Sequence, residues 1–304
     1  MFPAVGLVCM STLFMIGSGG NLDAQVVANF SGGTGTTGVD QWTGAAGSGW
    51  TGGWTTGASN ASDVTFSGEV KSNTPLSPGG GNYLSFSYAR SAGTSGNRAG
   101  FSRQASTTGE NPAVDLTQAY TVSFQLRFDS LTGWGQTSDQ LYISMEASDA
   151  VAKTGNLGGN TTGVVWGFYI QSRPQGTRWN FADGDSSYEQ LTWEIETGKV
   201  YTFQIDAFPN LATPTDSFYN ISILLEGEET PVVINDLQFR TTTTSGDLGT
   251  RWNSANHFGA RISMDANDAA IIAFDNFSIS QIPEPTSFSL LGLGACGWLF
   301  LRRK

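Results

Sequence analysis

The chain has 304 residues, 39 of them glycine, and a formal net charge of −11. This acidity disfavours nucleic acid and anionic membrane surfaces as partners, because both repel a negatively charged protein. The two cysteines, Cys9 and Cys296, lie in the apolar ends of the chain, so the region between them holds neither disulfides nor thiolate zinc sites.

The first 24 residues are small and apolar, which is typical of an export signal. The runs Val5–Val8 and Leu13–Ile16 form a hydrophobic region, and Leu22–Ala24 offers a cleavage site that ends in a small residue. No Lys or Arg occurs before Lys71, so the usual positive region at the start of a signal is absent. We predict a signal peptide at 1–24, followed by an exported domain at 25–281.

Three tryptophans, Trp42, Trp50 and Trp54, occur in the glycine-rich stretch WTGAAGSGWTGGWTT. Flat aromatic faces on loops can stack on sugar rings with a large contact area at low entropic cost. These residues are therefore candidates for glycan binding. The alternative, which we favour, is that they fill the core near the N-terminus of a β-sandwich.

Alternation of apolar and polar residues predicts about a dozen short strands. In Tyr120–Phe128, for example, every second residue is apolar. Clusters of Gly, Asn, Asp and Pro separate the strands, and no convincing helical period occurs between them. The sequence therefore predicts an all-β antiparallel sandwich of two sheets, in one domain. The other strands are expected at 64–70, 83–88, 141–145, 164–171, 178–182, 191–195, 201–205, 219–225, 232–239, 257–264 and 270–280. The expected buried residues are Val122, Phe124, Leu126, Phe203, Ile205 and Ile223.

Two features bear on catalysis. The single histidine, His257, lies in a strand pattern, and no Gly-x-Ser-x-Gly elbow accompanies it. We expect it to be structural. Glu194 and Glu196 alternate onto one face of a predicted strand, where their carboxylates would stand roughly 6–7 Å apart, a spacing found in glycosidases. The alternative is a solvent-facing strand, and we favour it, so the chain is not expected to be an enzyme.

The exported region resembles the concanavalin-like, laminin-G-like jelly rolls. The resemblance rests on the glycine-tryptophan segment Gly32–Trp54 and on the closing strand Ile271–Ile279. It implies a jelly-roll sandwich, a fold that includes lectins, carbohydrate-binding modules and glycan-cleaving enzymes.

The same resemblance implies a structural calcium ion, held partly by an aspartate on the final strand. Asp275 occupies the matching place, and Asp265, Asn267 and Asp268 lie on the loop before that strand. Carboxylate and carbonyl oxygens suit Ca²⁺. The alternative for Asp275 is a strand residue that hydrogen-bonds a neighbouring loop.

The C-terminal end contains an uncharged, apolar run of sixteen residues, Thr286–Leu301. As a helix with a rise of about 1.5 Å per residue, it covers roughly 24 Å of a hydrocarbon core of about 30 Å. The basic residues that follow prefer the cytoplasmic side of a membrane. We predict a transmembrane helix at 286–301 with its C-terminus in the cytoplasm. The alternative is a buried helix in a soluble fold.

This tail resembles the PEP-CTERM sorting signal of exported bacterial proteins. The resemblance rests on the triplet Pro283-Glu284-Pro285, the apolar run and the basic cluster Arg302-Arg303-Lys304. It implies a tail at 282–304 that an exosortase-type membrane protease cuts near the triplet. The motif is an address and does not specify what the exported domain does.

Together these features predict an exported, non-catalytic protein that is anchored in the inner membrane and then directed to the cell surface or extracellular matrix. Its expected activity is glycan binding through the β-sandwich. The alternatives are a structural matrix protein without a defined ligand and a polysaccharide hydrolase.

Overall fold

The structure is a computed structural model, and it describes residues 25–28, 30, 47–59, 62–91, 97–107, 113–137, 139–146, 164–184, 187–240 and 256–283. The predicted signal peptide at 1–24, Trp42 and the predicted membrane helix at 286–301 lie outside these residues. None of the helices within these ranges is long and apolar enough to cross a membrane.

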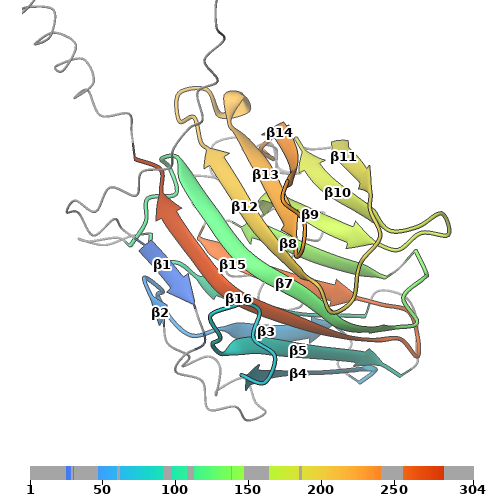
Figure 1. The fold of residues 1–304 in the computed structure, drawn as a ribbon. Helices are drawn as coiled ribbons and strands as arrows, with labels where there is room; N and C mark the ends of the chain where they lie inside the picture. Colours follow the sequence, from blue (N-terminus) through green and yellow to red (C-terminus); the bar gives the residue numbers. More distant parts are fainter. Residues whose placement is uncertain are drawn as a thin grey trace, which may run out of the picture.

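The described strands form two antiparallel sheets that pack face to face (Figure 1). The first is a nine-stranded sheet with the order β14–β13–β12–β7–β16. Beyond β16 it divides, because β5 pairs with the first half of β16 and β1 with the second half. The strands β4 and β2 then pair with β5 and β1. Its strands are β1 (Gln25–Ala28), β2 (Gly47–Ser48), β4 (Val64–Lys71), β5 (Tyr83–Arg90), β7 (Tyr120–Thr132), β12 (Val200–Phe208), β13 (Phe218–Leu225), β14 (Val232–Gln238) and β16 (Ala269–Gln281).

The second is a seven-stranded sheet with the order β11–β10–β9–β8–β15–β6–β3. The described residues contain no α-helix, only a short 3-10 turn at Pro214–Asp216. The predicted all-β sandwich of two antiparallel sheets is therefore confirmed. The strands of this sheet are β3 (Thr55–Ser59), β6 (Arg98–Gln104), β8 (Gln140–Glu146), β9 (Val164–Gln171), β10 (Arg178–Asp183), β11 (Ser187–Thr192) and β15 (His257–Ser263).

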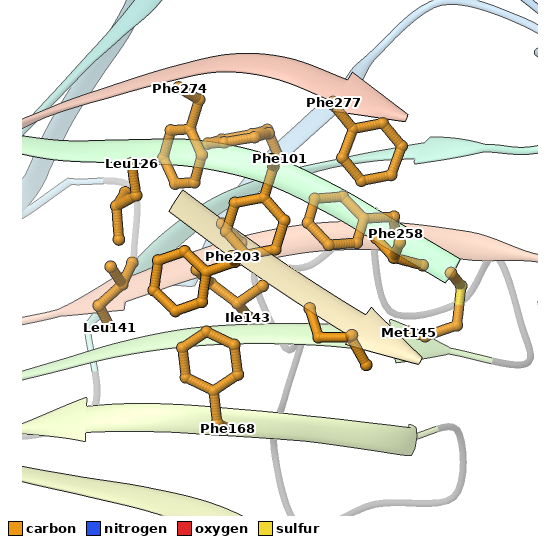
Figure 2. Close-up of a cluster of buried hydrophobic side chains, with 14 of the residues drawn as sticks. Phe101, Leu126, Leu141, Ile143, Met145, Phe168, Phe203, Phe258, Phe274 and Phe277 are labelled. Carbon is orange, nitrogen blue, oxygen red and sulfur yellow. The ribbon is translucent and has the colours of Figure 1, made fainter. Parts of the chain in front are cut away.

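The core lies between the sheets and is rich in phenylalanine (Figure 2). Phe203 of β12 stacks on Phe124 of β7, with ring centroids 4.7 Å apart, and on Phe168 of β9, at 5.2 Å. It therefore joins the two sheets. The six residues predicted to be buried are each at most 1% exposed, which confirms that expectation.

The predicted strands agree with the observed ones except near residue 191. There β11 ends at Thr192, so the segment with Glu194 and Glu196 follows the strand and does not form it. Four observed strands were not predicted, and β6 is the most informative of them. Its sequence RAGFSRQ is polar, yet nearly all of it is buried, because it lies between β15 and β3.

Candidate functional site

The outer face of the seven-stranded sheet carries a row of tyrosines. Leu141 and Ile143 are buried in the core, so by strand alternation Tyr142 on β8 points outward. Tyr142 is paired in register with Tyr169 on β9, and their rings stack with centroids 4.7 Å apart. Tyr188 on β11 meets Tyr169 edge-on, at 5.2 Å. All three tyrosines are half-buried, so the row is partly open to solvent.

An arginine stands at each end of this row. Arg261 on β15 is paired in register with Tyr142, and its guanidinium carbon lies 4.0 Å from the centre of that ring. Arg240, just after β14, lies over the ring of Tyr188 at 5.3 Å and donates a hydrogen bond to its hydroxyl. We call these five residues, Tyr142, Tyr169, Tyr188, Arg240 and Arg261, the tyrosine–arginine face.

The tyrosine–arginine face presents hydrogen-bond donors. The ring of Tyr142 is flanked by Arg261 and Tyr169, so sugar rings cannot stack on it. Side chains in strands stand roughly perpendicular to the sheet, which directs the phenol ends and ring edges outward. Ring edges carry partial positive charge, and guanidinium and phenol groups donate hydrogen bonds. The face is therefore suited to a ligand that is rich in oxygen acceptors.

Burial shifts the pKa values of these groups but does not change their protonation state at neutral pH. It raises the pKa of Tyr169 to about 12 and also raises the pKa of Tyr142. It lowers the pKa of Arg261 to about 10, and the nearby Arg98 adds to this effect. At pH 7 the phenols therefore keep their protons and Arg261 keeps its charge.

Small residues run across the strands beside the tyrosines. Ser144 on β8 is paired with Gly167 on β9 and with Gly259 on β15, which is paired in turn with Ser102 on β6. A Cβ atom at Gly167 would lie 2.9 Å from the Cβ of Ser144, so no larger side chain fits there. The adjoining pocket has a volume of about 10 Å³, which is room for roughly one water molecule. Its polar side chains are those of Tyr142, Ser144, Tyr169, Tyr188 and Arg240.

Glu146 and His257 lie on the other side of these small residues. They are paired in register on β8 and β15, and both are buried. The hydroxyl of Ser144 donates to Oε1 of Glu146 at 2.9 Å, and Nδ1 of His257 contacts the side chain of Asn256. An acid and an imidazole on neighbouring strands can exchange protons with a bound molecule.

The structure places Trp50 and Trp54 among core aromatics. Trp54 is only 4% exposed and packs on Phe30 and Phe101. Trp50 is half-buried, donates from its indole nitrogen to the Val27 carbonyl at 2.8 Å, and lies 5.7 Å from Trp54. This arrangement supports the interpretation that they fill the core, since neither ring offers an open face on a loop.

The four predicted calcium ligands do not come together. Asp265, Asn267 and Asp268 lie on the loop between β15 and β16, whereas Asp275 lies seven residues further along β16. At about 3.3 Å per residue this separation is roughly 20 Å. In the part of the chain that the structure describes, no three acidic, His or Cys side chains are placed to hold a metal ion.

Asp275 is instead buried on the outer face of the nine-stranded sheet. It is 3% exposed, and its Oδ1 has no hydrogen-bond partner among the described residues. Next to it on β16, Ala273 packs with Leu76, Tyr83 and Val200 beneath the loop that follows β4. Burial raises the pKa of Asp275 to about 6, although the backbone N–H of the next residue opposes this shift.

The two glutamates of the hydrolase alternative are exposed and lie beyond the end of β11. The carboxylate of Glu194 accepts hydrogen bonds from the backbone N–H and the hydroxyl of Thr177, at 3.1 and 3.2 Å. The backbone N–H of Glu196 donates to the Tyr201 hydroxyl. Glu194 thus stabilises the turn before β10 through these hydrogen bonds. Because both glutamates follow the end of β11, they do not lie on one face of a strand.

Residues 281–304 match the family model described as the PEP-CTERM protein-sorting motif. The chain carries a PEP-CTERM sorting motif. Its motif follows β16 directly, and Pro283 is exposed at the end of the described chain. The other predicted sorting residues lie outside the described residues, namely Glu284, Pro285, Arg302, Arg303 and Lys304. The motif indicates that the protein is exported and sorted to the cell surface.

No curated protein matches the chain. Among solved structures, it is similar to the marine alginate lyase from Aplysia kurodai, with 15% identity over 70% of this chain and 87% of that chain and a TM-score of 0.41. It is also similar to the Lotus tetragonolobus seed lectin, with 12% identity, coverage of 73% and 95%, and a TM-score of 0.42. Similarity at this level concerns the sandwich alone.

Proposed function

We propose that the protein binds polysaccharide at the cell surface through the tyrosine–arginine face and does not cleave it. The observation that carries this proposal is the row of three half-exposed tyrosines between two arginines. Phenol and guanidinium groups are suited to the hydroxyl and ring oxygens of sugars. Export and processing by an exosortase-type membrane protease are indicated by the sorting motif.

We expect the triple variant Tyr142→Phe, Tyr169→Phe, Tyr188→Phe to bind its glycan about 100-fold more weakly than the wild type. Each lost hydroxyl removes a hydrogen bond of about 1 kcal/mol. The rings stay, so ring stacking should change little. Tyr188→Phe also removes the acceptor of the Arg240 hydrogen bond, so the melting temperature of the variant is measured alongside binding. A glycan array identifies the ligand of the full-length protein, and calorimetry then compares the affinities of the two proteins.

The matched control is Thr202→Ala, on an exposed position of the nine-stranded sheet. It should bind as the wild type does. A blank array would favour the structural alternative, a matrix protein without a defined ligand. If the Thr202→Ala control lost as much binding as the triple tyrosine variant, the tyrosine–arginine face would not be the site.

Cleavage of the bound polysaccharide is the second candidate function, and one observation favours it. Glu146 and His257 are paired in register on the same sheet face as Arg261 and Tyr142. An acid–base pair beside a binding surface is the arrangement that glycan cleavage needs. Release of new chain ends by the wild type, lost in both Glu146→Gln and His257→Asn, would establish an enzyme in place of a binding protein.

The sorting tail gives a separate prediction. Deleting residues 283–304 should release the protein into the soluble exported fraction, whereas Pro283→Ala with Pro285→Ala should leave it uncut in the inner membrane. Each of the basic residues at 302–304 costs about 2.5–3.5 kcal/mol at the bilayer centre, so the tail resists full translocation. Cell fractionation with immunoblotting checks both outcomes. A full-length chain that stays with soluble cytoplasmic protein would contradict the predicted topology.

A further inference from the structure

Arg261 is a buried cation with unused hydrogen-bond donors. The residue is 2% exposed, and neither Nε nor Nη1 has a hydrogen-bond partner among the described residues. Its guanidinium lies 4.0 Å from the ring of Tyr142, which shields one face of the cation. Tyr142 and the buried carboxylate of Glu146 favour the charged form of Arg261, but burial and the charge of Arg98 outweigh them and lower its pKa. Burying a charge without pairing it is costly, so such a residue calls for an explanation.

The surroundings add positive charge to this place. Arg98 on β6 lies two residues from Gly100, the register partner of Arg261, and its charge disfavours a second cation there. Arg240, at the other end of the tyrosine row, is 8% exposed, and its Nε has no hydrogen-bond partner in the described part of the chain. Arg178 on β10 faces the same side. A chain with a net charge of −11 thus gathers arginines on one sheet face.

The groups between the arginines favour the same kind of ligand. Tyr142 and Tyr169 keep their protons at neutral pH and donate them to acceptors. Their outward ring edges carry partial positive charge. Cations, phenol donors and ring edges together favour an anion over a neutral sugar, because a charged hydrogen bond to an anion offsets the desolvation of Arg261 better than a neutral acceptor does.

From this arrangement we infer that the ligand is an acidic polysaccharide whose sugar carboxylates bind Arg261. The inference rests on the proposed glycan binding and names its substrate class. Arg240 lies at the other end of the row, over Tyr188, and can meet a second carboxylate, so a polymer with repeated charges fits better than a single charged sugar. The oxyanion could also come from a sulfated sugar, and the test separates these two sources.

The experiment measures binding of the full-length protein to polygalacturonate, to its fully methyl-esterified form and to dextran sulfate. We expect polygalacturonate to bind at least about tenfold more tightly than the ester, since a charged hydrogen bond is roughly twice as strong as a neutral one. Arg261→Met should lose this preference. Its melting temperature should be equal to or above that of the wild type, because methionine fills a similar volume without a buried charge.

Lys199→Met, on an exposed turn, is the matched control and removes the same charge. It should keep the preference. A lower melting temperature for Arg261→Met with the preference retained would show that Arg261 is structural. Equal binding of acid and ester would overturn the acidic ligand and leave glycan binding intact. Binding of dextran sulfate alone would replace carboxylate by sulfate. If the variant fails to fold, the acid–ester comparison on the wild type still decides.

Discussion

Phe203→Ala is expected to lower the free energy of unfolding by about 4 kcal/mol, the usual cost of removing a buried phenylalanine ring. Phe203 is fully buried and stacks on Phe124 in its own sheet. It also stacks on Phe168 in the other sheet (Figure 2). Its ring centroid also lies 6.1 Å from that of Trp179. Truncation leaves a cavity where the sheets meet, and rigid aromatic neighbours on both sides limit its collapse. Urea unfolding followed by tryptophan fluorescence measures the change.

Two further variants serve as controls for Phe203→Ala. Thr202→Ala alters the neighbouring exposed position and should change stability by less than about 0.5 kcal/mol. Phe203→Leu keeps most of the volume and should cost about half as much as alanine. A loss below about 1 kcal/mol for Phe203→Ala, with an unchanged m-value, would mean that Phe203 is not at the junction of the two sheets.

Asp275→Asn is expected to stabilise the protein at neutral pH by up to about 3 kcal/mol, the free-energy equivalent of the shift of its pKa from 3.8 to about 6. The folded state binds the proton more tightly than the unfolded state. The contribution of Asp275 to the free energy of unfolding is therefore largest below pH 4, falls as the pH rises from about 4 to 6, and is level above that range. The asparagine variant should lack this decline.

Chemical denaturation at several pH values from 3 to 8 gives both curves. Asp216→Asn removes the same charge from an exposed turn and serves as the control, with the decline preserved. An Asp275→Asn variant that is less stable than the wild type at pH 7 would show that the carboxylate is paired in the folded protein.

The fold was predictable where a strand has one apolar and one polar face. Tyr120–Phe128 and Tyr219–Leu225 alternate strictly, and both lie in the nine-stranded sheet with one face on the core. The strand β6 was not predictable, because its buried residues include Arg103, whose guanidinium packs on Trp50 and Trp54. Alternation reports burial of apolar residues, so it misses a strand that buries polar ones.

The candidate site depends on pairings between distant segments. Tyr142 and Arg261 are more than a hundred residues apart in the sequence and become neighbours only because β15 pairs with β8. The available local sign was a tyrosine at the outward positions of two predicted strands, at Tyr142 and Tyr169. The predicted calcium ligands failed to meet for a related reason, because an extended strand carries Asp275 away from the loop.

The position of β16 has a consequence for how the chain reaches the cell surface. This strand is late in the sequence, yet it lies in the middle of its sheet, where β7, β5 and β1 all pair with it (Figure 1). The pairing of Gln25 with Ser280 joins nearly the two ends of the described chain, so contact order is high and folding is slow. The sheet cannot close before residues 269–281 have been synthesised. The chain therefore completes this sheet only with the residues that lie directly before its sorting motif, which begins at residue 281.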